Sequence, residues 1–133
     1  MTAVSEIDIE ALVQRAVAGE RVEHSEVVEQ LVGIARALQN GFGAAGIAVT
    51  IESGYWVNWG RQWRIVVRIA AANLEQVLFK AYVPAEGYPV KLDFYGDRLE
   101  SAGDRAELED AVKRFIAQPE ISSQLAEIKA IAA

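Results

Sequence analysis

The sequence predicts an α+β fold: a four-stranded antiparallel β-meander with two N-terminal and two C-terminal helices packed mainly on one face. Apolar residues recur at helical spacing in the first 40 residues and again after residue 103, and they alternate with polar residues in four segments between these regions. The connections between those segments are short, which favours antiparallel neighbours. No linker divides the chain, so we expect residues 1–133 to form a single domain.

Two helices are expected before residue 40. The first spans residues 6–18, and Gly19 is expected to end it. The second spans residues 25–39, with Ser25 as its N-cap. The apolar face of the second helix is broad, which predicts contact on more than one side, for example with the sheet and with another helix or subunit. That face comprises Val27, Val28, Leu31, Val32, Ile34, Ala35 and Leu38.

Four segments with alternating polarity are the expected strands: residues 46–53, 61–71, 76–83 and 89–95. Residues 54–60 lie between the first two segments and predict a hairpin turn. Alternation assigns one apolar face to the core, comprising Ile47, Val49, Ile51, Trp63, Ile65, Val67, Ile69, Val77, Phe79, Ala81, Val83, Val90, Leu92 and Phe94.

Two short helices are expected after the sheet. Asp104 is a suitable N-cap for the first, because Glu107 follows three residues later as in a capping box. Pro119 ends that helix and begins the next one at its first position.

The segment Gly54–Arg64 holds all three tryptophans and one of the four tyrosines. Turns are normally polar because their backbone is solvated, so aromatic side chains here indicate a partner, a ligand or a covering helix. Tryptophan and tyrosine dominate protein-binding hot spots. We therefore expect Tyr55, Trp56 and Trp59 to bind a protein partner. The alternative is that these rings pack against the helices or one another.

The polar face of the predicted sheet is a second candidate site. Four cations share this face, which is compatible with a small-molecule or anion sensor. The competing interpretation is a solvated face with cross-strand ion pairs. A third possibility is an enzyme with a carboxylate and tyrosine site around Tyr82, Asp93 and Tyr95. The candidate ligand-binding residues are Arg64, Arg68, Lys80, Tyr82, Lys91 and Tyr95.

Charge and composition exclude several classes of function. The formal net charge is −6, and the acidic excess lies before residue 41 and after residue 97. A net basic patch typical of nucleic-acid-binding proteins is missing from the sequence, so no nucleic-acid partner is expected. The chain has no cysteine, which excludes disulfides and thiolate metal sites. Neither a basic, apolar leader nor a long apolar run is present, so we expect a cytoplasmic protein without a membrane partner.

Signatures of catalysis are also weak. His24 is the only histidine, and we expect it to be a surface residue beside a helix. The glycine spacing in G-F-G-A-A-G, residues 41–46, follows a helix and precedes a strand, the reverse of the dinucleotide-binding order. We expect no metal or cofactor, and no motif assigns the chain to a family. The sequence therefore predicts a small, non-enzymatic binding or adaptor protein that acts through protein contacts, with a homodimer or a hetero-complex expected rather than a lone monomer.

Overall fold

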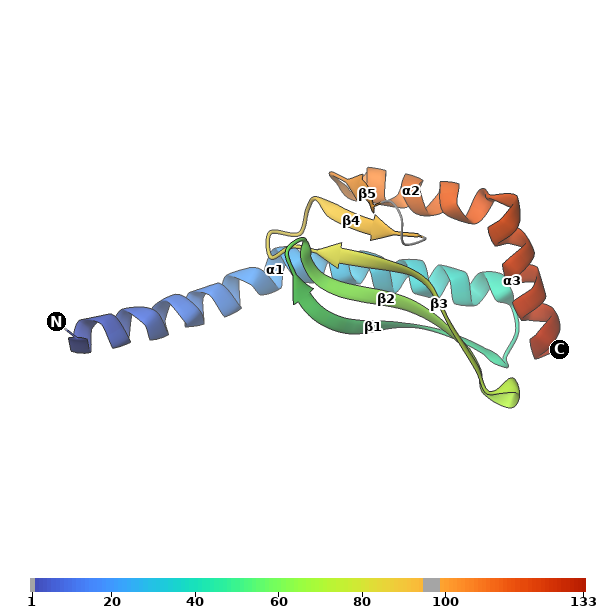
Figure 1. Cartoon of the computed structure of the whole chain (residues 1–133), viewed down its shortest axis with the longest axis horizontal. Coiled ribbons are helices and arrows are strands. Elements are labelled where there is room, and N and C mark those ends of the chain that lie inside the picture. The colour runs from blue at the N-terminus through green and yellow to red at the C-terminus, as the bar shows by residue number, and fades with distance from the viewer. Residues whose placement is uncertain (1, 95–98) are drawn as a thin grey trace.

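The computed structural model describes the backbone of residues 2–94 and 99–133, and the side chains of residues 9–11, 13, 14, 23–94 and 99–133. One long helix leads into a sheet, and two shorter helices follow it (Figure 1). In chain order the elements are α1 (Thr2–Phe42), β1 (Ile47–Val57), β2 (Gly60–Ile69), the 3-10 helix η1 (Ala70–Ala72), β3 (Leu74–Val83), β4 (Val90–Asp93), β5 (Leu99–Ala102), α2 (Arg105–Ala117) and α3 (Pro119–Ala132).

The sheet confirms the predicted α+β class and its antiparallel meander. Its strand order is β1-β2-β3-β4-β5, and every neighbouring pair is antiparallel. The sheet has five strands rather than four, because β5 pairs along the whole of β4. The turn signal Gly96-Asp97 predicts the end of the sheet, and β5 is only four residues long. So short a strand shows too little alternation to be recognised in a sequence.

The two expected N-terminal helices form one helix, so the predicted break between residues 18 and 25 is wrong. Gly19 and Ser25 both lie inside α1 rather than at its ends. A single glycine costs a helix about 1 kcal/mol relative to alanine, which does not stop it. No proline lies between residues 2 and 42, so nothing breaks the backbone hydrogen bonding there.

The first half of α1 projects beyond the sheet, as Figure 1 shows at its left-hand side. His24 is the first buried residue among the described side chains of this helix. We refer to residues 2–22 as the α1 arm. A helix of 41 residues is about 60 Å long at about 1.5 Å per residue, so α1 is much longer than the body it packs against.

All three helices contribute to one core on the same face of the sheet. From α1, Val27, Leu31 and Ala35 are buried in this core, and the apolar faces of α2 and α3 join them. Asp104 caps α2 as predicted: its Oδ1 accepts a hydrogen bond from the Glu107 backbone N–H at 2.8 Å. Most of the predicted core face of the strands is confirmed, including Ile47, Ile65, Ile69, Phe79, Val83, Val90 and Leu92.

Val77 is an exception to that face, and its predicted place in the core is wrong. The pairing of β2 with β3 shifts between Ile65 and Val66, so that Ile65 lies opposite Phe79 but Val66 lies opposite Val77. The extra residue, Leu78, is buried in the core. Because of this bulge, the β3 residues before Leu78 point to the opposite face of the sheet from the one that alternation predicts. Val77 is consequently 39% exposed.

Candidate functional site

The aromatic segment lies on a hairpin that is tighter than its sequence predicts. Strand β1 continues to Val57, which pairs with Gly60 at the start of β2. The turn therefore consists of Asn58 and Trp59 alone, whereas residues 54–60 were expected to form it. Tyr55 and Trp56 are strand residues for this reason, and they follow an irregularity in pairing between Ser53 and Trp56.

Four large apolar side chains are exposed together at this end of the hairpin. Tyr55 is 84% exposed, Trp56 53%, Val57 42% and Trp59 49%. We call these four residues the hairpin tip. A single exposed apolar residue is ordinary, but four of them within five positions of one hairpin make this end a candidate site of interaction.

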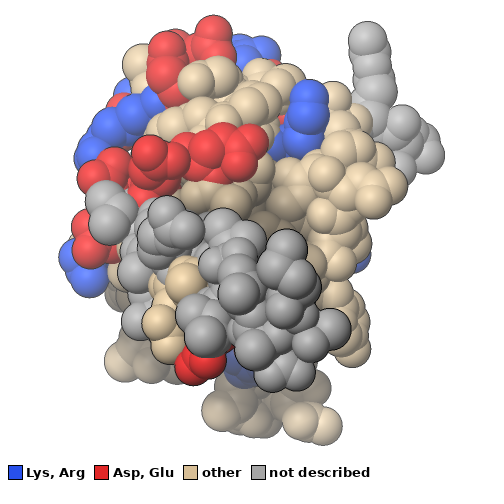
Figure 2. Space-filling view, turned by 90° about the vertical axis from the view of Figure 1, so that its left-hand side faces the viewer, with Lys and Arg blue, Asp and Glu red and all other residues tan. Residues whose placement is uncertain are grey.

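Charge is unevenly distributed over the end of the molecule from which α1 projects. Figure 2 looks at this end, and most of the described surface on its right-hand side is tan. Acidic and basic side chains gather instead on the left-hand side and at the top of that view. The charge of the protein is thus concentrated away from part of this end.

Two rings of the hairpin tip are held in place by contacts with the body. The ring of Trp56 lies 5.5 Å from that of His24, centroid to centroid. Trp59 meets the ring of Tyr82 edge to face at 5.5 Å. Aromatic pairs at such distances contribute about 0.5–1.5 kcal/mol beyond the area they bury. Trp56 and Trp59 are therefore both about half exposed and in contact with rings of the body.

His24 is buried, so its expected place on the surface is wrong. The indole Nε1–H of Trp63 donates a hydrogen bond to His24 Nε2 at 3.2 Å. Because Nε2 accepts this bond, the proton of a neutral ring is on Nδ1, which lies 3.1 Å from the carbonyl oxygen of Pro84 and donates to it. His24 thus connects α1 to β2 and to the loop after β3, directly beneath Trp56.

Trp63 packs against the core as predicted, although it is only partly buried. The guanidinium of Arg61 lies over its ring, with Cζ 5.1 Å from the centroid. Cations at this distance from an indole are attracted by its π face. Trp63 therefore belongs to the support of the hairpin tip rather than to its exposed surface.

On the polar face of the sheet, the arginines are ion-paired with carboxylates. Arg68 pairs with Glu52, and its Nε lies 3.2 Å from Glu75 Oε2. These hydrogen bonds with Glu52 and then Glu75 raise the pKa of Arg68 above its ordinary value. Arg64 also lies 3.7 Å from Glu52. The cross-strand ion pairs that the sequence predicts as an alternative to an anion site are therefore present.

The other candidates on this face also have neighbours. Lys91 Nζ donates to Ser101 Oγ at 3.2 Å, and Lys80 lies between Arg64 and Asp93 in the strand registers. Tyr82 is 7% exposed, and its hydroxyl accepts a hydrogen bond from Gln62 Nε2 at 3.2 Å. Tyr95 lies outside the described residues, so its part in either candidate site has no structural description.

The broad apolar face predicted for residues 25–39 has two parts in the structure. Val27, Leu31 and Ala35 pack on the sheet, whereas Ile34 and Leu38 line a groove between α1 and the C-terminal helices. The breadth of the face signals contacts on two sides, but the groove itself cannot be located from one helix alone. It depends on where α2 and α3 lie.

Comparison with protein-family models, with curated proteins and with solved structures found no match to this chain. Within the described residues, no three His, Asp or Glu side chains gather so that they would hold a metal ion. Across the same part of the chain, no helix has both the length and the apolar character needed to cross a membrane.

Proposed function

We propose that this chain is a non-enzymatic binding or adaptor protein of the cytoplasm that recognises a protein partner through the hairpin tip. The observation that carries the proposal is the exposure of Tyr55, Trp56, Val57 and Trp59 on one two-residue hairpin. Burying Trp and Tyr side chains that are already oriented gains apolar contact at a small entropic cost.

The partner surface that complements the hairpin tip is an apolar pocket or shallow groove with a polar rim. Tyr55, Trp56 and Trp59 each expose about half or more of their surface, so all three rings have apolar contact to gain. Trp56 and Trp59 also contact buried rings of the body, His24 and Tyr82 respectively. Loss of such a contact would mix an effect on binding with an effect on folding, so the variant that is tested must be as stable as wild type.

The test is quantitative affinity capture from the native cytosol with wild type and a Tyr55→Ser/Trp59→Ser variant of equal thermal stability. Hot-spot residues contribute about 2 kcal/mol or more each, so a partner that uses the tip should bind the variant at least about 30-fold more weakly. Ile131→Ser is the matched control, because Ile131 is 47% exposed and lies on α3.

A partner retained by the control and lost by the tip variant would support the proposal. An identical set of partners for wild type, control and tip variant would overturn it. In that case the aromatic rings would serve only the packing around His24 and Tyr82.

A further inference from the structure

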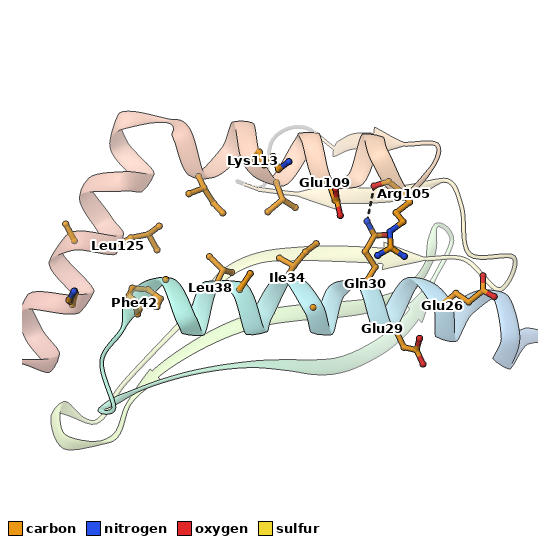
Figure 3. Close-up of a pocket in the computed structure, with 17 residues that line it drawn as sticks. Glu26, Glu29, Gln30, Ile34, Leu38, Phe42, Arg105, Glu109, Lys113 and Leu125 are labelled. Carbon is orange, nitrogen blue, oxygen red and sulfur yellow. Dashed lines mark hydrogen bonds between the residues drawn. The ribbon is translucent and has the colours of Figure 1, made fainter.

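An apolar groove runs alongside the second half of α1. Figure 3 shows the groove between α1 on one side and α2 on the other, with α3 at one end. Its volume is about 1080 Å³, and its described lining comes from these three helices alone. The larger apolar side chains that line it are Ile34, Leu38, Phe42, Val112, Ile116 and Leu125.

The end of the groove nearest Glu26 is braced by a polar contact. The side chain of Gln30 donates from Nε2 to the Arg105 carbonyl oxygen at 2.9 Å, which ties α1 to the start of α2. This bond is the dashed line in Figure 3. This hydrogen bond therefore joins the two walls of the groove, α1 and α2, at that end.

Two described apolar side chains of the α1 arm lie open to solvent. Ile9 is 61% exposed and Val13 is 55% exposed. They are four residues apart on a helix, so they lie on the same face, one turn from each other. Helices in proteins are stabilised mainly by packing of an amphipathic face. The arm has such a face and nothing in its own chain against it at these two positions.

The lengths of the arm and of the groove correspond. The arm has 21 residues and is about 31 Å long, whereas the groove follows α1 from Glu26 to Phe42, about 25 Å at about 1.5 Å per residue. Arm and groove lie along one continuous helix. A second copy placed antiparallel to α1 therefore brings each arm to the other's groove by a single two-fold rotation.

One register of this arrangement matches the apolar residues. If Ile9 lies opposite Leu38 of a second copy, Val13 lies opposite Ile34, because both pairs have the same four-residue spacing. The two-fold axis then passes between residues 23 and 24, where α1 leaves the sheet. Both arms are thus covered, and the two bodies lie at opposite ends of the paired helices.

Charge favours the same orientation. The arm sequence is acidic at Glu6, Asp8 and Glu10. In the antiparallel arrangement these residues approach the end of the groove that carries Lys129, one turn beyond Leu125 on α3. A parallel arrangement would direct them towards Glu26 and Glu29 instead, where like charges repel.

We propose that a second copy of this chain occupies the groove, with each α1 arm docked between α1 and α2–α3 of its partner. The product is a symmetric dimer with two identical arm-in-groove contacts. This proposal does not rest on the function proposed for the hairpin tip, which lies on β1 and β2 and does not line the groove.

The first test is the mass of the full chain by sedimentation equilibrium between about 1 and 100 µM. Wild type should have twice the chain mass of 14.5 kDa. An Ile9→Asp/Val13→Asp variant should raise the dimer dissociation constant at least about 100-fold, because docking would bury four unpaired carboxylates. Both positions are exposed in the single chain, so the monomer should keep its fold and its far-UV spectrum.

A disulfide test fixes the register, because the chain has no cysteine of its own. A Val13→Cys/Ile34→Cys variant should form a covalent dimer on mild oxidation. Within one chain these positions are about 32 Å apart along the helix, far beyond disulfide reach. Val13→Cys/Arg36→Cys is the matched control, because Arg36 is exposed and does not line the groove.

Three results would overturn the proposal. One is a monomeric wild type at 100 µM, and another is a dimer whose dissociation constant is unchanged by the two aspartates. The third is covalent linkage of an Ile9→Cys/Val13→Cys variant without linkage of Val13→Cys/Ile34→Cys. That pattern would mean that the arms pair with each other and leave the groove empty.

Discussion

At the scale of single residues, His24 determines how the aromatic hairpin is held. It accepts from Trp63 Nε1, donates to the Pro84 carbonyl and supports the ring of Trp56. A buried polar ring is stable only when its nitrogens are paired. The position of Trp56 at the hairpin tip therefore depends on a residue of α1 that is 39 positions away from Trp63 in sequence.

A double-mutant cycle tests this coupling. His24→Phe keeps a ring of similar size but removes both hydrogen bonds and leaves the Trp63 N–H and the Pro84 carbonyl unpaired. It should lower the free energy of unfolding by about 1–3 kcal/mol. Trp63→Phe should lower it as well, and the double variant should lose less than the sum by about 0.5–3 kcal/mol. Urea denaturation of the four proteins measures the coupling; strictly additive losses would contradict the hydrogen bond.

At the scale of elements, the turn between β1 and β2 depends on one glycine. Gly60 has φ of +125°, and a Cβ built there would lie 2.4 Å from the Val83 carbonyl carbon and oxygen. These are backbone atoms of β3, which cannot move without disturbing the sheet. Close approach of β3 and the left-handed conformation together require glycine.

Gly60→Ala should therefore lower the free energy of unfolding by at least about 2 kcal/mol, from strain and displaced backbone. Gly33→Ala is the opposite control, because it lies within α1 with no atom within 4 Å of its built Cβ. Alanine is preferred to glycine in a helix by about 0.5–1 kcal/mol, so this variant should be more stable than wild type. Thermal unfolding of both variants checks the prediction, and a neutral Gly60→Ala would contradict it.

The elements also show what can be predicted from the sequence. Strands β1 to β4 and the capped helix α2 follow clear periodicity and turn chemistry, because their residues satisfy local rules. The break near Gly19 and the core position of Val77 are wrong for different reasons, the first local and the second nonlocal. A helix continues through one glycine when nothing opposes it, and the bulge at Leu78 follows from pairing with β2.

In the candidate site, too, some features can be predicted from local sequence and others depend on distant segments. The aromatic residues of the hairpin tip are recognisable in the sequence because tryptophans are concentrated where a turn should be polar. The buried place of His24 and the groove beside Ile34 are not, because each is formed by segments far apart in the chain. Sequence periodicity identifies the faces of elements, whereas a site between elements needs their packing.

At the scale of the whole molecule, Gln30 joins α1 to the loop between β3 and β4 and to the start of α2. Its Nε2 donates to the Arg105 carbonyl, and its Oε1 accepts from the Tyr88 hydroxyl at 2.6 Å. Burial is the main cause that raises the pKa of Tyr88 above its ordinary value, and Arg105 acts in the opposite direction.

This shift predicts how stability changes with alkaline pH. An unfolded tyrosine ionises at about pH 10, whereas folded Tyr88 keeps its proton to higher pH. The contribution of the neutral Tyr88 hydroxyl to the free energy of unfolding is thus fully present below about pH 10 and is lost as pH rises through the folded pKa. Tyr88→Phe removes this pH dependence. The free energy of unfolding of the variant should therefore be lower than that of wild type below about pH 10, and the difference should shrink above it.

Urea denaturation between about pH 8 and pH 11 measures the difference, with the unfolded tyrosine titrating near pH 10. A Tyr88→Phe deficit that stays constant over the whole range would contradict the pKa shift.

The separate environments of the three tryptophans have a spectroscopic consequence. Trp56 and Trp59 are about half exposed, whereas Trp63 is partly buried against the core. Indole emission moves to shorter wavelength when water is removed from the ring, and an aqueous quencher such as iodide reaches exposed rings first. A protein that covers the hairpin tip should therefore shift the emission to the blue and protect it from iodide. The molecule thus carries an intrinsic optical reporter at the very surface where we expect recognition to occur.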